Sequence, residues 1–282
     1  MAGTSTEPGV WAVVLNYNGA AVLGECLRSL CKQDYPNFHI LVVDNASTDG
    51  SEKIAGEIEG IELVRNEENL FFAGGNNVGI RHAIDAGADY IVLINNDTVS
   101  DPALISALVT AIEADKDAGI AGPKIYYHER PDVIWSAGGL VDFGKGWVRH
   151  RGIRQQDKGR FDSVAEVDYV TGCCLMFSRE VFSFLQGLDE SFPMYYEDTD
   201  FCTRARKTGY KIIYVPDGKM WHKISFSSGG EFAWKKIKRR IRAGWKFFGK
   251  HSTLGQRILM PFWQIVEFFR VVGMLIKRKF AG

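Results

Sequence analysis

The chain has 282 residues, 46% of them hydrophobic and 24% charged, which is long enough and apolar enough for a full globular core. It has no clean run of eighteen apolar residues and its first nine residues are polar, so we expect neither a transmembrane helix nor a signal peptide. The formal net charge is zero and excludes no class of partner, and the five cysteines lack zinc-type spacing, which favours reduced thiols in a cytosolic protein.

Strand-like and helix-like segments alternate through residue 125. The expected strands are apolar runs, and the expected helices carry apolar residues at helical spacing or begin at capping residues. In chain order we expect strand 10–15, helix 20–32, strand 38–43, a helix opened by the turn 45–50, strand 61–64, helix 75–86, strand 90–94, a helix starting at 101–102, and strand 119–125. This alternation predicts an α/β fold with a mostly parallel central sheet flanked by helices on both faces.

The pattern changes after Tyr127. Residues 131–170 are rich in glycine and aromatic residues and have no long helical period, so we expect hairpins and a loop. A short strand at 171–177, a short helix at 179–186 and a strand at 211–215 follow. We expect a catalytic domain over residues 1–230 and a separate tail over 231–282.

Polar residues stand at the ends of three expected strands. Asn16, Asp44 and Asp97 fall at carboxyl ends, where ligands bind in parallel α/β sheets. Asp44 could accept hydrogen bonds from a pyrimidine base or a ribose hydroxyl, or it could form a turn. Asp97 could hold a hard divalent cation together with a diphosphate, or it could cap the next helix.

The segment Tyr195–Phe201 contains three carboxylates within four positions, Glu197, Asp198 and Asp200. Carboxylates so close to one another repel when they are charged, so at least one of the three should hold its proton more tightly or need a cation nearby. A helix N-terminus also favours acidic residues and is the structural alternative. Together with Asp97, this cluster predicts a divided site, in which one acid serves a metal and another a proton.

Two further features are weaker. Gly74-Gly75-Asn76-Asn77 would let a helix N-terminus approach a phosphate, although it is not a GxGxxG sequence. His222 lies just past an expected strand. It is either structural or, if the fold brings it near Asp97, a ligand.

Taken together, these segments resemble the family-2 glycosyltransferases with the GT-A fold, and in particular the rhamnosyltransferase-like branch. The matching segments in order are 13–18, 42–51, 69–79, 95–97, 172–175, 197–200 and His222. The resemblance implies donor contacts, metal ligands for Mg²⁺ or Mn²⁺, a general base, and acceptor or loop residues. The donor contacts are Asn16, Asp44, Asn76, Asn96 and Asp97, and the metal ligands are Asp97 and His222. The general base is Asp198. The acceptor or loop residues are Glu197, Asp200, Gly172 and Cys173. Asn95 replaces the usual first acid of the family's DxD motif, which makes Asp97 the main side-chain ligand.

The resemblance implies an inverting, metal-dependent hexosyltransferase. It would move a sugar, with rhamnose favoured, from a dTDP- or UDP-sugar to a hydroxyl of a glycan or polyprenyl-linked acceptor in cell-envelope polysaccharide synthesis. Two alternatives stay open. A nucleotidyltransferase would normally have a basic glycine-rich loop where residues 16–19 stand. A non-catalytic, membrane-attached nucleotide-sugar-binding protein is conceivable because of Asn95.

The tail is basic and amphipathic. Residues 231–282 contain thirteen Lys or Arg against two acids, so residues 1–230 carry about −11 to balance the tail's +11. Residues 258–276 are apolar except for three polar residues at three-residue spacing, Gln264, Glu267 and Arg270. A helix with this pattern can lie in a membrane interface, where each nearby basic residue contributes roughly 1 kcal/mol on anionic lipid. We therefore expect a cytoplasmic protein at the inner face of the membrane, with no nucleic-acid partner. The alternative is an appendage packed on the catalytic domain or on a second subunit of a homodimer.

Overall fold

The computed structural model describes residues 7–192, 194–223, 234–263 and 265–266. The first half of the chain forms β1 (Val10–Asn16), α1 (Leu23–Leu30), β2 (Phe38–Asp44), α2 (Ser51–Gly56), β3 (Ile61–Arg65), α3 (Phe71–Asp85), β4 (Tyr90–Asn95), β5 (Thr98–Ser100) and α4 (Leu104–Glu113). The second half forms β6 (Ala118–Tyr127), β7 (Arg130–Ser136), β8 (Gly139–Asp142), β9 (Trp147–His150), β10 (Ala165–Glu166), β11 (Cys174–Ser178), α5 (Arg179–Leu185), α6 (Glu197–Lys207), β12 (Lys211–His222) and α7 (Trp234–His251).

A large central sheet runs in the order β10-β12-β6-β11-β4-β1-β2-β3, with β5 paired to β12 and β7 to β6. The pairs β3–β2, β2–β1 and β1–β4 are parallel, as the alternating pattern predicts, and so is β6–β12. β11 is antiparallel to both β4 and β6, so the sheet is mixed beyond β4. The prediction of an α/β sheet is confirmed, and its parallel character is strongest in the first four strands. Residues 131–170 form hairpin strands, as expected.

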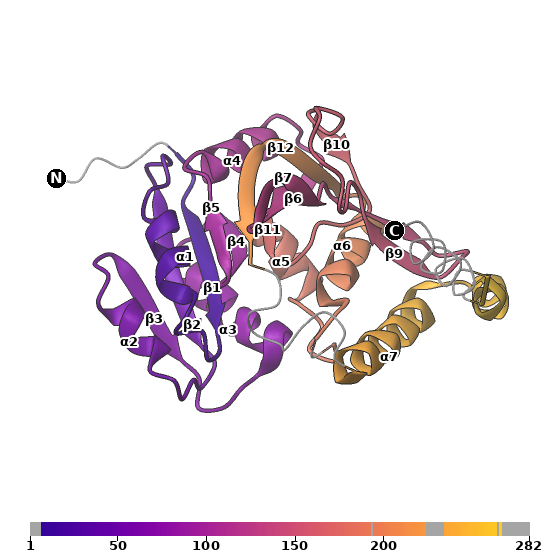
Figure 1. The fold of residues 1–282 in the computed structure, drawn as a ribbon, viewed down its shortest axis with the longest axis horizontal. Coiled ribbons are helices and arrows are strands. Elements are labelled where there is room, and N and C mark those ends of the chain that lie inside the picture. Colours follow the sequence, from indigo (N-terminus) through magenta and orange to yellow (C-terminus); the bar gives the residue numbers. More distant parts are fainter. Residues whose placement is uncertain (1–6, 193, 224–233, 264, 267–282) are drawn as a thin grey trace, which may run out of the picture.

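Helices cover both faces of the sheet because alternate residues of each strand point to opposite sides. Val10, Ala12 and Val14 of β1 lie in one core cluster, together with apolar residues of α1 and α4. Trp11 and Val13 lie in a second cluster with residues of α3, α5 and α6. The helices thus form two layers around the strands (Figure 1).

The Gly74–Asn77 segment lies inside α3 rather than at its start, which corrects the expected helix 75–86. Asn69 Oδ1 accepts a hydrogen bond from Phe71 N at 2.8 Å, which favours a helix beginning at residue 71. Gly75 and Gly79 serve packing instead, since a Cβ atom on Gly75 would lie 2.5 Å from Leu15 Cδ1. A Cβ atom on Gly79 would lie 2.5 Å from Val13 Cγ1 and 2.6 Å from Val43 Cγ2. Glycine therefore lets α3 lie close to β1 and β2.

β12 is longer than the expected strand 211–215. Its pairing with β6 is interrupted by a register shift between Val215 and Lys219 and then resumes to His222. The short strand β5 pairs antiparallel with this second part, with Thr98 opposite His222. His222 therefore ends a strand rather than following one.

α7 packs on the body of the protein at the end away from α2 (Figure 1). Ala243, Phe247, Phe248 and Met260 form a small core with Phe192. The chain is helical again over 254–263. The described part of the tail is thus a packed appendage on one side. The expected domain boundary between residues 230 and 231 lies outside the described residues, as do Gln264, Glu267 and Arg270. Within the described ranges, no helix combines the length and the apolar character needed to span a bilayer.

Candidate active site

The carboxyl ends of β1, β2 and β4 are joined through Asn16. Asn16 is paired in register with Asp44, and Leu15 with Asn95. The Asn16 amide nitrogen donates to Asp44 Oδ1 at 3.0 Å and to Ser51 Oγ at 2.8 Å, and Asn96 Nδ2 donates to Asn16 Oδ1 at 2.9 Å. Asn16, Asp44 and Asn96, three of the residues predicted to bind the nucleotide-sugar, therefore meet at one edge of the sheet.

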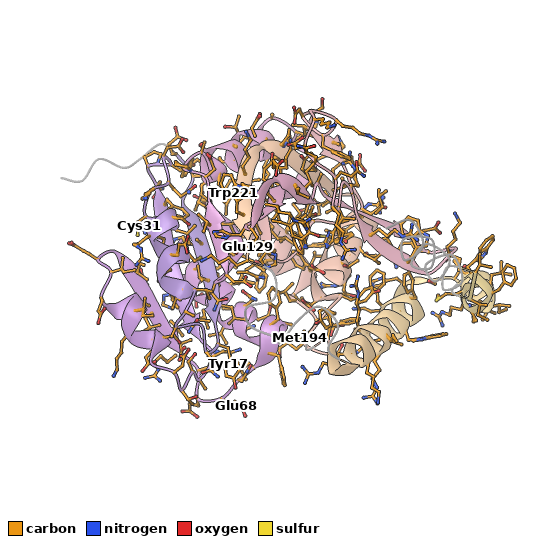
Figure 2. The ribbon with its side chains drawn as sticks, viewed as in Figure 1. Tyr17, Cys31, Glu68, Glu129, Met194 and Trp221 are labelled. Atoms are coloured by element: carbon orange, nitrogen blue, oxygen red, sulfur yellow. The ribbon has the colours of Figure 1, made fainter. Side chains whose placement is uncertain are left out.

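Asn16 and Asp44 are fully buried at that edge. Asp44 Oδ2 also accepts from Ser47 N at 3.1 Å and lies 3.6 Å from Arg65 Nε. Both side chains thus hold the turns that follow β1 and β2. The neighbouring Tyr17 is 48% exposed and lies on the surface below β1 (Figure 2).

Asp97 and His222 meet because β5 pairs with β12. Asp97 Oδ1 lies 3.2 Å from His222 Nε2, yet neither Asp97 Oδ1 nor His222 Nδ1 has a hydrogen-bond partner, although both atoms are buried. The contact is thus close without hydrogen-bond geometry. Ligands at adjacent corners of an octahedral ion with bonds of about 2.1 Å lie about 3 Å apart.

The distance between Asp97 Oδ1 and His222 Nε2 therefore suits two ligands of one divalent cation. Among the described residues no three His, Cys, Asp or Glu side chains gather for a metal, so the remaining ligands would come from a diphosphate and water. The ring of Trp135 lies edgewise against His222, with centroids 4.7 Å apart, and limits the imidazole's freedom to rotate.

Asp198 lies half-buried in the first turn of α6. Its Oδ2 accepts from Gly172 N at 2.9 Å, and its Oδ1 accepts from Thr199 N at 2.6 Å. A Cβ on Gly172 would lie 2.9 Å from Phe72 Cζ, so glycine allows this loop to approach the start of α3. The carboxylate is oriented by backbone groups, and the residue as a whole is partly exposed.

Cys173 connects the surroundings of Asp97, the predicted metal ligand, with those of Asp198, the predicted general base. Its carbonyl accepts from Asn95 N at 3.0 Å, two residues from Asp97, while Gly172 on its other side contacts Asp198. Burial raises the pKa of the Cys173 thiol, and the charges of Asp97 and Asp198 raise it further. The fold therefore brings both acids to the same edge of the sheet.

The neighbours of Asp198 differ in environment. Glu197 is buried, its Oε2 has no hydrogen-bond partner, and burial followed by the charge of Asp198 raises its pKa well above the usual range. Asp200 is fully buried, which alone would raise its pKa, but hydrogen bonds from His251, Lys250 and Arg204 lower it. In this cluster Glu197 tends to keep its proton, Asp198 is partly exposed, and Asp200 is ion-paired.

Asn76 and Asn77 face different surroundings. The Asn76 amide donates to Phe72 O within α3 at 2.9 Å, and a contact with the donor stays a prediction. Asn77 Nδ2 donates to Leu188 O at 2.9 Å, and its Oδ1 accepts from Leu188 N at 2.9 Å. Lys250 and His251 have no signal in the sequence that points to this cluster, because Asp189 and Asp200, with which they pair, are distant in the chain.

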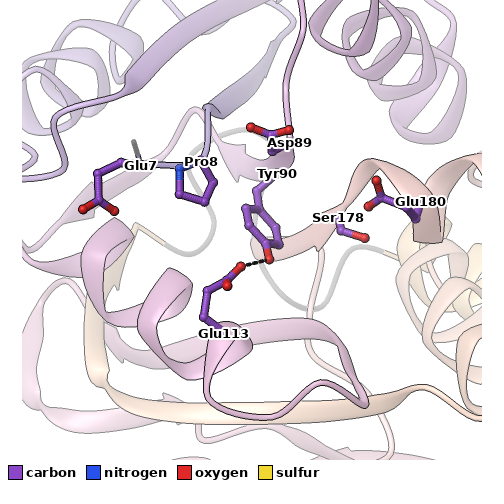
Figure 3. A pocket seen from close by; sticks show the side chains of 7 residues that line it. All are labelled: Glu7, Pro8, Asp89, Tyr90, Glu113, Ser178 and Glu180. Carbon is purple, nitrogen blue, oxygen red and sulfur yellow. Dashed lines mark hydrogen bonds between the residues drawn. The ribbon is translucent and has the colours of Figure 1, made fainter. Parts of the chain in front are cut away.

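A hollow of about 450 Å³ opens at the opposite edge of the sheet (Figure 3). It lies beside Tyr90, which begins β4, whereas the candidate site lies beyond Asn95, which ends it. The lining residues are Glu7, Pro8, Asp89, Tyr90, Glu113, Ser178 and Glu180. None of the predicted site residues contributes to it, so the chemistry is assigned to the other edge.

Sequence comparison places residues 11–185 in a match to Glycosyl transferase family 2. The N-acetylglucosaminyl-diphospho-decaprenol L-rhamnosyltransferase of Mycobacterium tuberculosis is 28% identical over 235 residues, which cover 77% of this chain and 76% of that protein. The dTDP-rhamnosyl transferase RfbF of Shigella flexneri is 26% identical over 219 residues, covering 78% and 70%.

Solved glycosyltransferase structures share the fold. A mannosyltransferase from Pyrobaculum calidifontis, in complex with GDP-Man and Mn²⁺, has a TM-score of 0.60 at 19% identity and covers 98% of this chain and 81% of its own. GalNAc-T7 with UDP, GalNAc and Mn²⁺ has a TM-score of 0.66 at 16% identity. That match covers 85% of this chain, which spans 48% of GalNAc-T7. The expected GT-A fold is confirmed.

Proposed function

Because the chain belongs to glycosyl transferase family 2, we propose that it is an inverting hexosyltransferase. It moves a sugar from a nucleoside diphosphate to a hydroxyl of a glycan or polyprenyl-linked acceptor in cell-envelope polysaccharide synthesis. The observation that carries the proposal is the convergence of Asp97, His222 and Asp198 around Cys173 at one sheet edge. Relatives named as rhamnosyltransferases favour rhamnose, with dTDP-rhamnose as the first donor to test.

Asp97 and His222 are proposed to hold a Mg²⁺ or Mn²⁺ ion. When bound, such an ion would neutralise the negative charge that develops on the leaving diphosphate. The buried Asp97 Oδ1 without a hydrogen-bond partner supports this assignment. Trp135 supports it further by fixing the imidazole plane.

Asp198 is proposed to be the general base. Its carboxylate would take the proton from the acceptor hydroxyl as the oxygen attacks the anomeric carbon from the side opposite the diphosphate. One displacement of this kind inverts the anomeric centre. The hydrogen bonds from Gly172 N and Thr199 N orient the carboxylate for that step.

The nucleotide is proposed to bind at the edge formed by Asn16, Asp44 and Asn96, near Asn76. Since Asn16 and Asp44 are fully buried and hydrogen-bonded to each other, a base or ribose can contact Asp44 only if the groups that cover it move. Glu197, Asp200, Gly172 and Cys173 are proposed to shape the acceptor side.

The tail is proposed to place the enzyme at the cytoplasmic face of the membrane. Its described part exposes apolar side chains, among them Trp245 at 51%, Ile258 at 69% and Phe262 at 60%. Basic residues of α7 lie nearby in the chain, so the surface suits anionic lipid. A homodimer remains a prediction.

A donor and acceptor screen tests the function. Purified full-length chain is incubated with dTDP-rhamnose, UDP-sugars or GDP-mannose and a polyprenyl-diphosphate-linked N-acetylglucosamine, with Mg²⁺ or Mn²⁺. Product analysis should detect sugar transfer with inverted configuration. Pyrophosphate release from a nucleoside triphosphate would instead identify a nucleotidyltransferase. Nucleotide-sugar binding without any transfer or hydrolysis would contradict the enzyme assignment.

A further inference from the structure

α7 contacts the segment that carries Asp198. Phe247 and Phe248 of α7 are almost completely buried, and the ring of Tyr196 lies 5.2 Å from the ring of Phe247. A Cβ on Gly244 would lie 3.1 Å from the Tyr196 hydroxyl oxygen. The helix is thus fitted closely against Tyr196, the residue that precedes α6.

Charged contacts fix the same segment. Lys250 Nζ donates to Asp189 Oδ2 at 2.7 Å and lies 2.7 Å from Asp200 Oδ1. Lys246 Nζ donates to Ser191 O at 2.6 Å. The second half of α7 therefore contacts Asp189, Ser191 and Asp200 as well as Tyr196.

His251 completes the junction. Its Nδ1 lies 2.9 Å from Lys207 Nζ and its Nε2 lies 2.7 Å from Asp200 Oδ1. An ammonium can only donate, so Nδ1 accepts from Lys207 and Nε2–H donates to Asp200. His251 thereby joins α7 to the first and last turns of α6.

The contacts of α7 matter for Asp198 because Asp198 lies between two residues that α7 contacts. Tyr195 and Tyr196, just before α6, both have positive φ angles of 72° and 71°. Such angles are unfavourable for side chains other than glycine and persist where the surroundings impose them. Asp198 lies between Tyr196 and Asp200, and α7 contacts both of these residues.

We propose that α7 is a positioning element of the active site, in which His251 and Lys250 fix Asp200 and so hold the Asp198 carboxylate against Gly172. The inference rests on the proposed function for Asp198. It assigns the tail a role in turnover in addition to any contact with a membrane. Neither His251 nor Lys250 touches the reacting atoms, so both are positioning residues.

Variants of the full-length protein test this role. His251→Ala and Lys250→Ala remove the two donors, and Gly249→Ala is the matched control because a Cβ there meets nothing within 4 Å. Displacement of a catalytic group by about 1 Å can lower a rate by about 100-fold. We expect His251→Ala to lower kcat by about tenfold or more, with the KM for the donor changed less than about twofold. Gly249→Ala should match the wild type.

Hydrogen exchange separates positioning from general loss of stability. In His251→Ala, backbone amides of residues 189–200 should exchange faster while those of β1, β2 and β4 keep their wild-type rates. In a double-mutant cycle, Asp200→Asn with His251→Ala should lose much less than the product of the single losses.

An unchanged kcat in both variants would overturn the proposal, as would exchange that accelerates across the whole chain. If the wild type transfers no sugar, the proposed function fails. The exchange experiment then still decides whether α7 holds residues 189–200.

Discussion

Replacement of Asp198 by Asn removes the proposed base while keeping the shape of the side chain. A positioned general base contributes about 10²–10⁴-fold to a rate. This range equals about 2.7–5.4 kcal/mol of activation free energy, because each tenfold change corresponds to about 1.36 kcal/mol. We expect kcat of Asp198→Asn to fall by that factor.

The substitution also changes the hydrogen bonds around residue 198. The carboxylate accepts from Gly172 N at 2.9 Å through one oxygen, and through the other from Thr199 N at 2.6 Å and Thr199 Oγ1 at 3.0 Å. Asn has one oxygen, so its NH₂ group must face at least one backbone donor. An unpaired buried donor costs about 1–3 kcal/mol, so some loss of stability is expected as well.

The assay must therefore separate turnover from folding and binding. Initial transfer rates at saturating donor are compared with nucleotide affinity and with the midpoint of denaturant unfolding. Thr199→Val serves as a control, because it removes one hydrogen bond to the carboxylate and keeps the base. Nucleotide affinity should stay near that of the wild type in both variants. Turnover of Asp198→Asn within about twofold of the wild type would refute the base assignment.

Three further predictions concern packing, titration and the metal. Gly79→Ala places a Cβ 2.5 Å from Val13 Cγ1. Overpacking costs about 1–3 kcal/mol against a helix gain of about 1 kcal/mol, so denaturant unfolding should report a net loss, and unchanged stability would contradict the close packing of α3. Burial raises the pKa of Glu197, so the folded chain binds its proton more tightly than the unfolded chain and stability falls as pH rises above about 4.3. The free energy of unfolding of Glu197→Gln should fall less than that of the wild type between about pH 5 and 8, and parallel curves would count against this. His222→Ala should raise the Mg²⁺ or Mn²⁺ concentration for half-maximal transfer by about tenfold or more, and a chelator should abolish wild-type transfer. Activity insensitive to chelation would exclude the metal role.

Much of the site edge could be predicted from local pattern. Apolar runs that end at Asn16 and Asp44 indicate neighbouring parallel strands, and the structure pairs these two residues in register. The alternation of strand and helix was sufficient to predict the α/β class, since each segment shows the hydrophobic pattern of its own secondary structure. The family resemblance then supplied roles for side chains whose positions the pattern already indicated.

Other features have no local signal. β5 covers only Thr98–Ser100, too short for any periodicity, and β12 continues past an irregularity at 215–219 that ends the apparent strand. Their pairing brings His222 to Asp97. The glycines at 74 and 75 suggest a helix terminus, but α3 begins at Phe71, and Gly75 instead allows close packing on Leu15.

The tail shows most clearly what the local sequence pattern indicates and what only the tertiary structure reveals. Its basic and apolar pattern predicts an amphipathic helix over 258–276, because charge and periodicity are properties of neighbouring residues, and the structure describes helix there over 258–263 and 265–266. Only the tertiary structure decided that Phe247 and His251 turn inward onto residues 189–200. Contacts of this kind join groups far apart along the chain and form only once both elements are packed. The sequence by itself determined most of the strands and helices and the chemical character of their ends, and packing determined which ends meet.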